Sequence, residues 1–351
     1  MKRVLSFILG VLCVVVVAGC ILHYLNDEGE GGTVSATKQI YAMDTVMSIT
    51  AYGKKAEEAV EAAAAEILRL DALLSTGEET SEISLLNAAG TYEVSEDTAA
   101  IIEEACVIYE ETGGLFDITV YPVMQLWGFP TQEYYVPADE ELAAALELVD
   151  GSLVDMDGYA VTLGEGQQVD LGGIAKGYTS NRVMEIFEEY GIKSGMVSLG
   201  GNIQTLGKKT DGTSWKIGIQ NPDTESSESV LLVLEVEDRA VITSGGYERY
   251  FEEDGETYIH IIDPRTGYPA DTGLESVSII SENGMLADAL STSLFIMGLD
   301  DAIEFWRSSA GDFEMIIVTE EKEIYITEGI ASDAALSVDE YTMKTVERQA
   351  G

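Results

Sequence analysis

The sequence predicts an α+β fold built as one main domain. Strand-like and helix-like segments follow one another without the regular strand–helix–strand alternation that gives a doubly wound parallel sheet. No Pro/Ser-rich linker divides the body of the chain. The 351 residues are 46% hydrophobic, which suits a globular protein with a sizeable core and excludes general disorder.

Composition also limits the function. The chain has 19 Lys and Arg against 63 Asp and Glu, a net charge of −44. This excess repels polyanions, so nucleic acids and anionic lipid surfaces are excluded as partners, and a phosphate-bearing ligand would need cations placed locally. Only two histidines occur, His23 and His260, which excludes a zinc site built from several imidazoles.

The N-terminus has the pattern of an export signal. Two cations at 2–3 precede an uncharged apolar stretch, and the small residues Ala18 and Gly19 come directly before Cys20. This resembles the lipobox of bacterial lipoproteins, in which the Cys is lipidated after cleavage. We therefore expect a signal peptide at 1–19 and a lipidated Cys20 with an acidic tether to residue 36. An uncleaved signal-anchor helix over 4–25 is the alternative, and both place the body outside the cytoplasm on a membrane.

Within the body, hydrophobic periodicity and turn residues predict the individual elements. Ser95 is expected to cap a helix that ends near Thr112, before two glycines. Cys106 falls on the apolar face of that helix, which favours a packing role over a nucleophilic one. Further helices are expected over 54–74, 138–149, 174–190, 285–297 and 300–309. A hairpin is expected over 153–170, and other strands over 40–51, 195–206, 215–220, 230–236, 258–262, 276–281, 314–319 and 323–327.

A glycine-rich run from Asp170 to Tyr178 joins a strand to a helix. Successive amides at a helix start can hold an anion, and Lys176 adds a positive charge. The run lacks the spacing of a P-loop and of a dinucleotide fingerprint. A tight structural turn explains it equally well. Double glycines also end the strand-like segments at 200–201 and 245–246, and together the three turns could line one pocket.

Two further patterns could carry chemistry. His260 leads from a strand into a Pro-Arg-Thr-Gly turn, and an imidazole is a natural general base near neutral pH. Asp288 and Thr292 lie four residues apart on an expected helix, so their oxygens face the same way and could bind Mg²⁺ or Ca²⁺. A half-buried strand histidine and an Asp favoured in the first turn of a helix are the plain structural alternatives.

Taken in order, these motifs resemble the ApbE-like FAD:protein FMN transferase family over 41–327. The residues that carry the resemblance are Met43-Asp44-Thr45, Ser81-Glu82-Ile83, Gly114-Leu115-Phe116-Asp117, Leu126-Trp127-Gly128-Phe129, Asp170 to Tyr178, Gly200-Gly201-Asn202, Ser244-Gly245-Gly246-Tyr247, His260 to Gly267 and Asp288 to Thr292. The resemblance implies a bilobed, T-fold-related architecture over 37–345, with the ligand in a cleft between the lobes.

The resemblance also implies an activity: FMN moves from FAD onto a Thr or Ser hydroxyl of an acceptor flavoprotein, and AMP is released. The implied acceptors are flavin-carrying subunits of exported or membrane electron-transfer complexes. By position, the implied FAD-binding residues are Met43, Leu115, Phe116, Asp117, Asp170, Lys176 and His260. The implied Mg²⁺ ligands are Asp288, Thr292 and a carbonyl near Gly173, with Ser291 adjoining them. His260 is expected to be the base, and Asp263 to orient the hydroxyl or share that role.

One position departs from the family. Relatives often have an aromatic residue after Ser-Thr that can stack on the flavin, whereas Gly77 follows Ser75-Thr76 here. The missing stacking is worth on the order of 1 kcal/mol. An FAD pyrophosphatase that uses water, and a non-catalytic flavin-binding lipoprotein, are therefore kept as alternatives.

Overall fold

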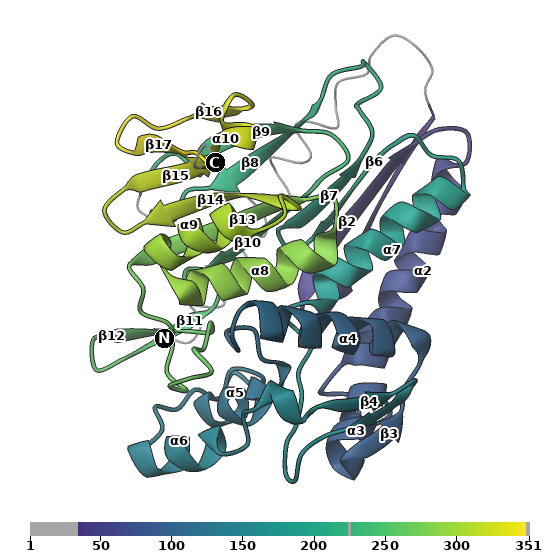
Figure 1. Ribbon diagram of the computed structural model, residues 1–351. Helices are drawn as coiled ribbons and strands as arrows, with labels where there is room; N and C mark the ends of the chain where they lie inside the picture. Colours follow the sequence, from purple (N-terminus) through teal and green to yellow (C-terminus); the bar gives the residue numbers. More distant parts are fainter. Residues whose placement is uncertain (1–33, 224–225, 349–351) are drawn as a thin grey trace, which may run out of the picture.

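The computed structural model describes residues 34–223 and 226–348. The expected signal peptide, Cys20 and most of the expected tether lie outside the described residues. As predicted, the fold is α+β. A nine-stranded sheet runs through the described chain in the order β1-β2-β6-β7-β10-β13-β14-β15-β17 (Figure 1). These strands are β1 (Ser35–Ala42), β2 (Thr45–Tyr52), β6 (Ser194–Leu199), β7 (Asn202–Leu206), β10 (Ala240–Gly245), β13 (Leu274–Ser281), β14 (Phe313–Thr319), β15 (Glu323–Thr327) and β17 (Thr342–Val346).

Four helices pack against one face of this sheet (Figure 1). They are α2 (Ala56–Leu74), α7 (Ala175–Glu189), α8 (Gly284–Met297) and α9 (Leu299–Ser308). The apolar faces of α2 and α7 meet β1, β2 and β6 in a core cluster that includes the fully buried Met47, Ile67 and Phe187. Helix α8 is apolar almost all round, because it lies between the sheet and the helices of the smaller lobe.

The other face of the large sheet carries a three-stranded sheet, in the order β16-β9-β8. Its strands are β8 (Trp215–Gln220), β9 (Val230–Val236) and β16 (Ala334–Leu336). Every second side chain of β8 is buried, as a strand with one solvent face requires. These side chains pack against Ile280 and Ile316 of the large sheet. The described fold is thus layered, with the main sheet in the middle.

The remaining elements form the smaller lobe, in the lower part of Figure 1. They are α3 (Glu82–Ala89), β3 (Thr91–Glu93), α4 (Glu96–Glu111), η1 (Ile118–Val120), α5 (Tyr121–Trp127), α6 (Asp139–Leu146), η2 (Gly151–Leu153), β4 (Asp155–Asp157), β5 (Ala160–Thr162) and the hairpin of β11 (Tyr250–Glu253) and β12 (Glu256–Ile259). One further short helix, α10 (Glu328–Ala331), follows β15 and belongs to the main lobe. Trp127, Phe129 and Phe251 form the core beneath that hairpin. A larger apolar cluster joins α3 and α4 to α8 and continues across the lobes.

Most of the longer elements confirm the sequence expectations. Ser95 caps α4 as predicted, and its hydroxyl accepts from the Thr98 amide at 3.5 Å. Cys106 on this helix is only half-buried and packs against the edge of the core, and its burial raises the pKa of the thiol. Two expectations were wrong in detail. The segments 40–51 and 195–206 each contain a tight turn, so each belongs to a hairpin rather than to one strand.

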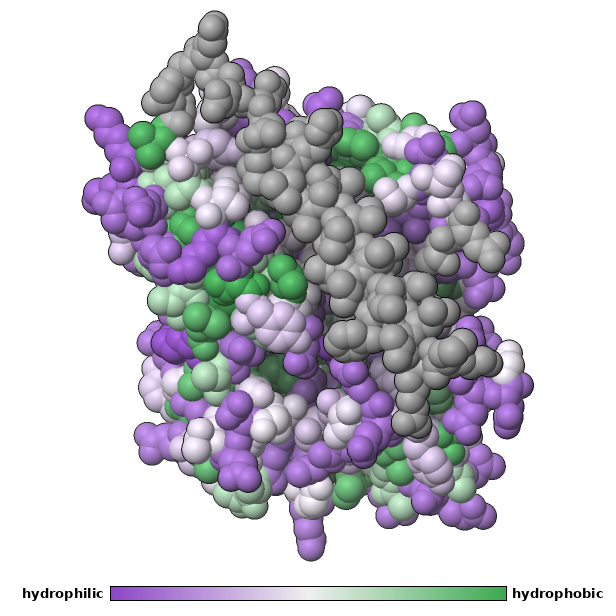
Figure 2. Space-filling view, turned by 180° about the vertical axis from the view of Figure 1, so that it is seen from behind, coloured by the Kyte–Doolittle hydropathy of each residue, from purple (hydrophilic) through white to green (hydrophobic). Residues whose placement is uncertain are grey.

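Much of the surface shown in Figure 2 is hydrophilic. On the face in Figure 2, hydrophilic side chains predominate among the coloured atoms, and hydrophobic ones form separate small patches. Among residues 34–223 and 226–348, no helix combines the length and the apolar character needed to cross a bilayer.

Candidate active site

Several strand ends that carry sequence motifs meet at one end of the large sheet. Met47 pairs with Leu199, so β2 begins where β6 ends, and β7 starts there because Asn202 pairs back with Leu199. Strand β10 runs antiparallel to β7 and finishes at this same end, at Gly245. Motifs separated by up to 200 residues in sequence are therefore neighbours in space.

The turn between β1 and β2 has an unusual backbone. Met43 and Asp44 have φ angles of +46° and +59°, a left-handed conformation that costs non-glycine residues on the order of 1 kcal/mol each. The backbone amide of Met43 donates to Asp71 Oδ1 at 2.9 Å, which helps to hold this turn. The Met43 side chain is half-buried between the two main core clusters. The structure therefore fixes Met43 at the end of the sheet where the motifs meet.

Helices α7 and α8 cross closely at two glycines. A Cβ at Gly177 would lie 2.2 Å from the Gly284 carbonyl oxygen and 2.7 Å from Asp288 Cβ. This approach lets the Gly177 amide donate to Asp288 Oδ2 at 2.8 Å, while Asn202 Nδ2 donates to Oδ1 at 2.8 Å. Asp288 is only 5% exposed and is held from two sides.

This contact occupies amides at the start of α7 that the sequence analysis considered for binding an anion. The anion at the helix start is the carboxylate of Asp288, which accepts from the amides of Gly177 and Lys176. The amide of Gly172 is also engaged, because it donates to Asp170 Oδ1 at 2.8 Å. A phosphate ligand would therefore need the side chains around this turn rather than these amides.

A group of hydroxyls lies next to Asp288. Ser244 Oγ, near the end of β10, is 2.8 Å from Ser291 Oγ and 3.2 Å from Thr292 Oγ1. Ser291 Oγ donates to the backbone carbonyl of Asp288 at 2.8 Å. The structure thus brings the predicted residues Asp288, Ser291 and Thr292 to one side of α8, facing β7 and β10.

This donor set fits a hard divalent cation. All side-chain donors are oxygens, and the three N–H groups that donate to the Asp288 carboxylate leave one of its four lone pairs for a cation. Burial raises the pKa of Asp288 despite the nearby positive charge of Lys176, so added positive charge would stabilise the ionised form. No three Asp, Glu, His or Cys side chains of the described residues gather as a metal site. A Mg²⁺ ion here would therefore complete its shell with water or ligand oxygens.

His260 follows the β11–β12 hairpin and is half-exposed. Its Nδ1 lies 3.2 Å from the backbone carbonyl oxygen of Arg249. A carbonyl can only accept, so Nδ1 carries the proton and the lone pair is on Nε2. Desolvation, together with the positive charges of Arg249 and Lys176, lowers the pKa of His260 to about 4. The imidazole is therefore neutral at pH 7 and can accept a proton at Nε2.

Charged side chains lie around His260 and Asp288. Lys176 and Arg249 both act electrostatically on His260 and on Asp170, whose pKa is raised by desolvation. The Arg249 guanidinium also lies 3.9 Å from the Asp44 carboxylate. Desolvation raises the pKa of Glu248 to about 7, against the opposing charge of Lys176. The site thus combines two cations with desolvated Asp170, Glu248 and His260.

The sequence reasoning assigned no role to Glu248 or Arg249. The available signal was their position, directly after the Gly245-Gly246-Tyr247 turn. Asn202 was quoted only as part of a turn, although it holds Asp288. Arg249 matters most, because it gives the site a second cation beside Lys176.

Two predicted site residues have structural partners instead. Asp117 accepts from Thr119 through Oδ1 and from the Gly151 amide at 3.0 Å through Oδ2, so its carboxylate holds the chain around η1 and η2. Asp263 forms a bidentate ion pair with Arg265, at 2.9 and 2.7 Å, within the Pro-Arg-Thr-Gly turn. In the structure Asp263 therefore helps to shape this turn.

The other predicted ligand-binding residues are buried in the core. Leu115 and Phe116 are buried in the large core cluster. The Phe116 ring packs against Gly173, where a Cβ would lie 3.2 Å from it. Gly173 precedes α7 in the turn that the sequence placed near the cation. Phe116 therefore packs against the turn that precedes α7.

Comparison with known proteins gives consistent results. The model of the ApbE family matches residues 43–317. The FAD:protein FMN transferase of Haemophilus influenzae is 34% identical over 315 residues, covering 87% of this chain and 90% of that protein. The transferase of the same name from Treponema pallidum is 33% identical, covering 82% and 85%.

Solved structures agree with the sequence relatives. The ApbE protein of Thermotoga maritima superposes with a TM-score of 0.79 at 34% identity, covering 84% of this chain and 98% of that one. The flavin transferase ApbE from Vibrio cholerae superposes with a TM-score of 0.74 at 29% identity, covering 82% and 94%.

Proposed function

Because this chain belongs to the ApbE family, we propose that it is an FAD:protein FMN transferase. The reaction moves FMN from FAD to a Thr or Ser hydroxyl of an acceptor protein, through a phosphoester bond, with Mg²⁺ as cofactor and AMP as the other product. The observation that carries this proposal is the meeting of Asp288, a neutral His260 and two cations at one end of the sheet.

Substrate binding rests on the charged side chains of the site. The diphosphate of FAD carries negative charge into a strongly acidic protein, and Lys176 and Arg249 are the cations placed to offset it. Asp288, with the hydroxyls of Ser291 and Thr292, would hold Mg²⁺. When bound, Mg²⁺ supplies charge neutralisation on the phosphates and on the departing AMP.

His260 is the proposed general base. Its Nε2 takes the proton of the acceptor hydroxyl while that oxygen attacks the phosphorus of the FMN half of FAD. The bond from this phosphorus to the bridging oxygen breaks, and AMP leaves with that oxygen. The bond between Nδ1 and the Arg249 carbonyl keeps the proton on the far nitrogen, so that Nε2 stays available.

We further propose that Cys20 bears a lipid anchor and that the enzyme acts outside the cytoplasm. The support is the sequence pattern of a charged start, an apolar stretch and small residues before Cys20. Flavin-carrying subunits of exported or membrane complexes are then the acceptors within reach. Mass spectrometry of the purified protein from its native cell would detect a lipidated Cys20, and an intact Met1 would contradict the anchor.

One experiment separates transferase from its alternatives. The protein is incubated with FAD, Mg²⁺ and a candidate acceptor, and AMP and protein-bound flavin are measured. AMP together with labelled acceptor supports the transferase. AMP with free FMN alone would identify an FAD pyrophosphatase. Gly77 favours this alternative because glycine has no aromatic side chain to stack on the flavin. No AMP under any condition would indicate a flavin-binding protein.

A further inference from the structure

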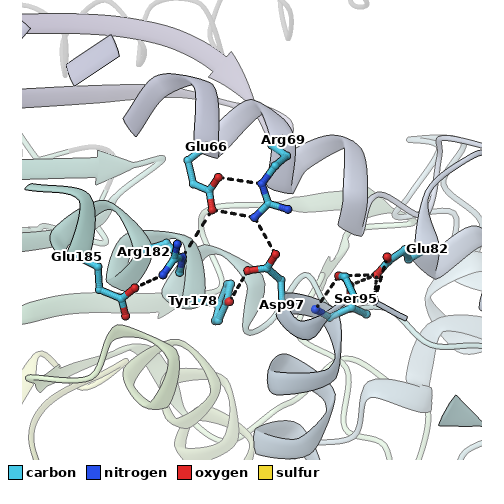
Figure 3. Close-up of polar contacts among 9 residues, drawn as sticks. Glu66, Arg69, Glu82, Ser95, Asp97, Tyr178, Arg182 and Glu185 are labelled. Atoms are coloured by element: carbon cyan, nitrogen blue, oxygen red, sulfur yellow. Dashed lines mark hydrogen bonds and ion pairs between the residues drawn. The ribbon is translucent and has the colours of Figure 1, made fainter. Parts of the chain in front are cut away.

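A polar network ties α7 to two other helices (Figure 3). The Tyr178 hydroxyl on α7 donates to Asp97 Oδ1 on α4 at 2.6 Å. Arg69 on α2 donates to the other oxygen of Asp97 at 2.8 Å, and its guanidinium also forms two 2.8 Å bonds with Glu66. A single carboxylate therefore joins all three helices.

Asp97 is an ionised acceptor in this network. Burial opposes its charge, but the hydrogen bonds from Tyr178 and Arg69 outweigh burial and lower the pKa of Asp97. The Tyr178 bond is therefore charge-assisted, which explains its short length.

The first turn of α7 depends on contacts of this kind. Its N-cap residue, Ile174, provides no side-chain cap, so the turn is held from outside the helix. On one side the Gly177 amide donates to Asp288, and the next residue, Tyr178, donates to Asp97 on another side. Lys176 precedes both. The same short turn thus links the network in Figure 3 to the cation-binding carboxylate.

We propose that Tyr178 and Asp97 form a positioning pair that keeps the first turn of α7 in place, so that the Gly177 amide holds Asp288 oriented for Mg²⁺. This inference rests on the proposed function and adds two residues that act on Mg²⁺ binding through Asp288. Partners that orient a metal-binding carboxylate influence metal affinity strongly, although they are not ligands themselves.

A purely structural role is the competing explanation. The network is partly exposed, with 44% of the Arg69 side chain accessible, and ion pairs of that kind contribute little to stability. The fold of α7 is secured further along the helix, where Val183 and Phe187 are fully buried against α2 and the sheet. Loss of one hydroxyl at Tyr178 should therefore leave the fold intact.

The test compares Tyr178→Phe with Tyr190→Phe in the whole protein. Tyr190 lies at the C-terminal end of the same helix, so it is a matched control that loses the same hydroxyl far from Asp288. FAD binding is followed by flavin fluorescence across a Mg²⁺ titration, and AMP release is measured in parallel. We expect Tyr178→Phe to need roughly tenfold more Mg²⁺ for half-maximal FAD binding and to recover at saturating Mg²⁺. Tyr190→Phe should match the wild type.

A second variant distinguishes loss of this link from misfolding of Tyr178→Phe. Asp97→Asn keeps an acceptor for Tyr178 but removes the charge, so it should shift the Mg²⁺ requirement the same way by a smaller factor. The double variant should be no worse than Tyr178→Phe alone, because both changes break one link. The proposal would be overturned if Tyr178→Phe needed no more Mg²⁺ than Tyr190→Phe. It would also be overturned if the double variant raised the Mg²⁺ requirement by the product of the two single effects. Absence of AMP release by the wild type would refute the proposed function instead.

Discussion

Replacing Asp288 by Asn tests the centre of the site. The change keeps the size of the side chain but exchanges one carboxylate oxygen for an NH2 group. In the structure both oxygens accept from N–H donors, namely the Gly177 amide and Asn202 Nδ2. Whichever way the new amide turns, one of these donors faces another donor.

The size of the effect follows from these contacts. A buried donor left unpaired costs about 1–3 kcal/mol, partly offset here because a desolvated charge is also removed. We therefore expect a loss of about 1 kcal/mol in the free energy of unfolding, measured by urea titration. Loss of the only carboxylate in the donor set should cost Mg²⁺-dependent AMP release at least about a hundredfold, or about 3 kcal/mol.

The assay measures AMP from FAD over a Mg²⁺ series, with Ser293→Ala as the matched control. Ser293 is fully buried on the same helix, and its hydroxyl donates to the Ala289 carbonyl rather than to the site. This control should lose stability but keep AMP release. The assignment of Asp288 to the cation would be wrong if Asp288→Asn released AMP at the wild-type rate and with the wild-type Mg²⁺ dependence.

Three further changes follow from the same geometry. His260→Ala should bind FAD with unchanged affinity and lose turnover, and unchanged turnover would remove His260 from the mechanism. Because the pKa of His260 is about 4 when folded and near 6.5 as a free side chain, the unfolded chain takes up the proton first. Wild-type unfolding free energy should thus fall as pH drops from 6.5 towards 4, and less steeply in His260→Ala. Gly177→Ala should lower the free energy of unfolding in urea by about 1–3 kcal/mol and reduce AMP release, because the added Cβ meets the Gly284 carbonyl oxygen. Helix propensity alone predicts the opposite result, a more stable protein. Gly77→Tyr should tighten FAD binding about fivefold in a fluorescence titration, because the new ring can stack on the flavin. The larger residue fits there, since a Cβ at position 77 meets only Ser75 Oγ, at 3.7 Å. Weaker or equal FAD binding would contradict flavin stacking.

Helices with strong local signals were predictable from the sequence. The helix predicted over 174–190 is α7, flanked by Ile174 and Tyr190, and the cap at Ser95 marks the start of α4. The turn at Met43 and Asp44 was missed because it lacks the glycine that usually marks two positive φ angles. For strand β10 the sequence indicated only its end, at the double glycine 245–246. Its extent was not predicted, because its pairing with β7 and β13 is set by distant chain segments.

The candidate site was predictable only in its parts. Asp288 and Thr292 could be paired by helical spacing, but no local pattern says that the Gly177 amide, 111 residues away, occupies an oxygen of that carboxylate. The same reason applies to Asp117, because the Gly151 amide that occupies its Oδ2 lies 34 residues away. The partner of Asp263 is local instead, because Arg265 is two residues away in the same turn. Hydrogen bonds made in the folded chain decide which acidic side chains remain available to bind a cation or ligand.

The first strand has a consequence for access by large substrates. Ser35 pairs with Tyr52 at one end of the sheet, and Ala42 pairs with Thr45 at the other, beside the candidate site. Eight residues of strand span about 26 Å. The segment preceding Ser35 therefore joins the folded body at the end remote from His260. An anchor attached through that segment would join the folded body at the end of the sheet opposite the candidate site, which would leave that site accessible to an acceptor protein.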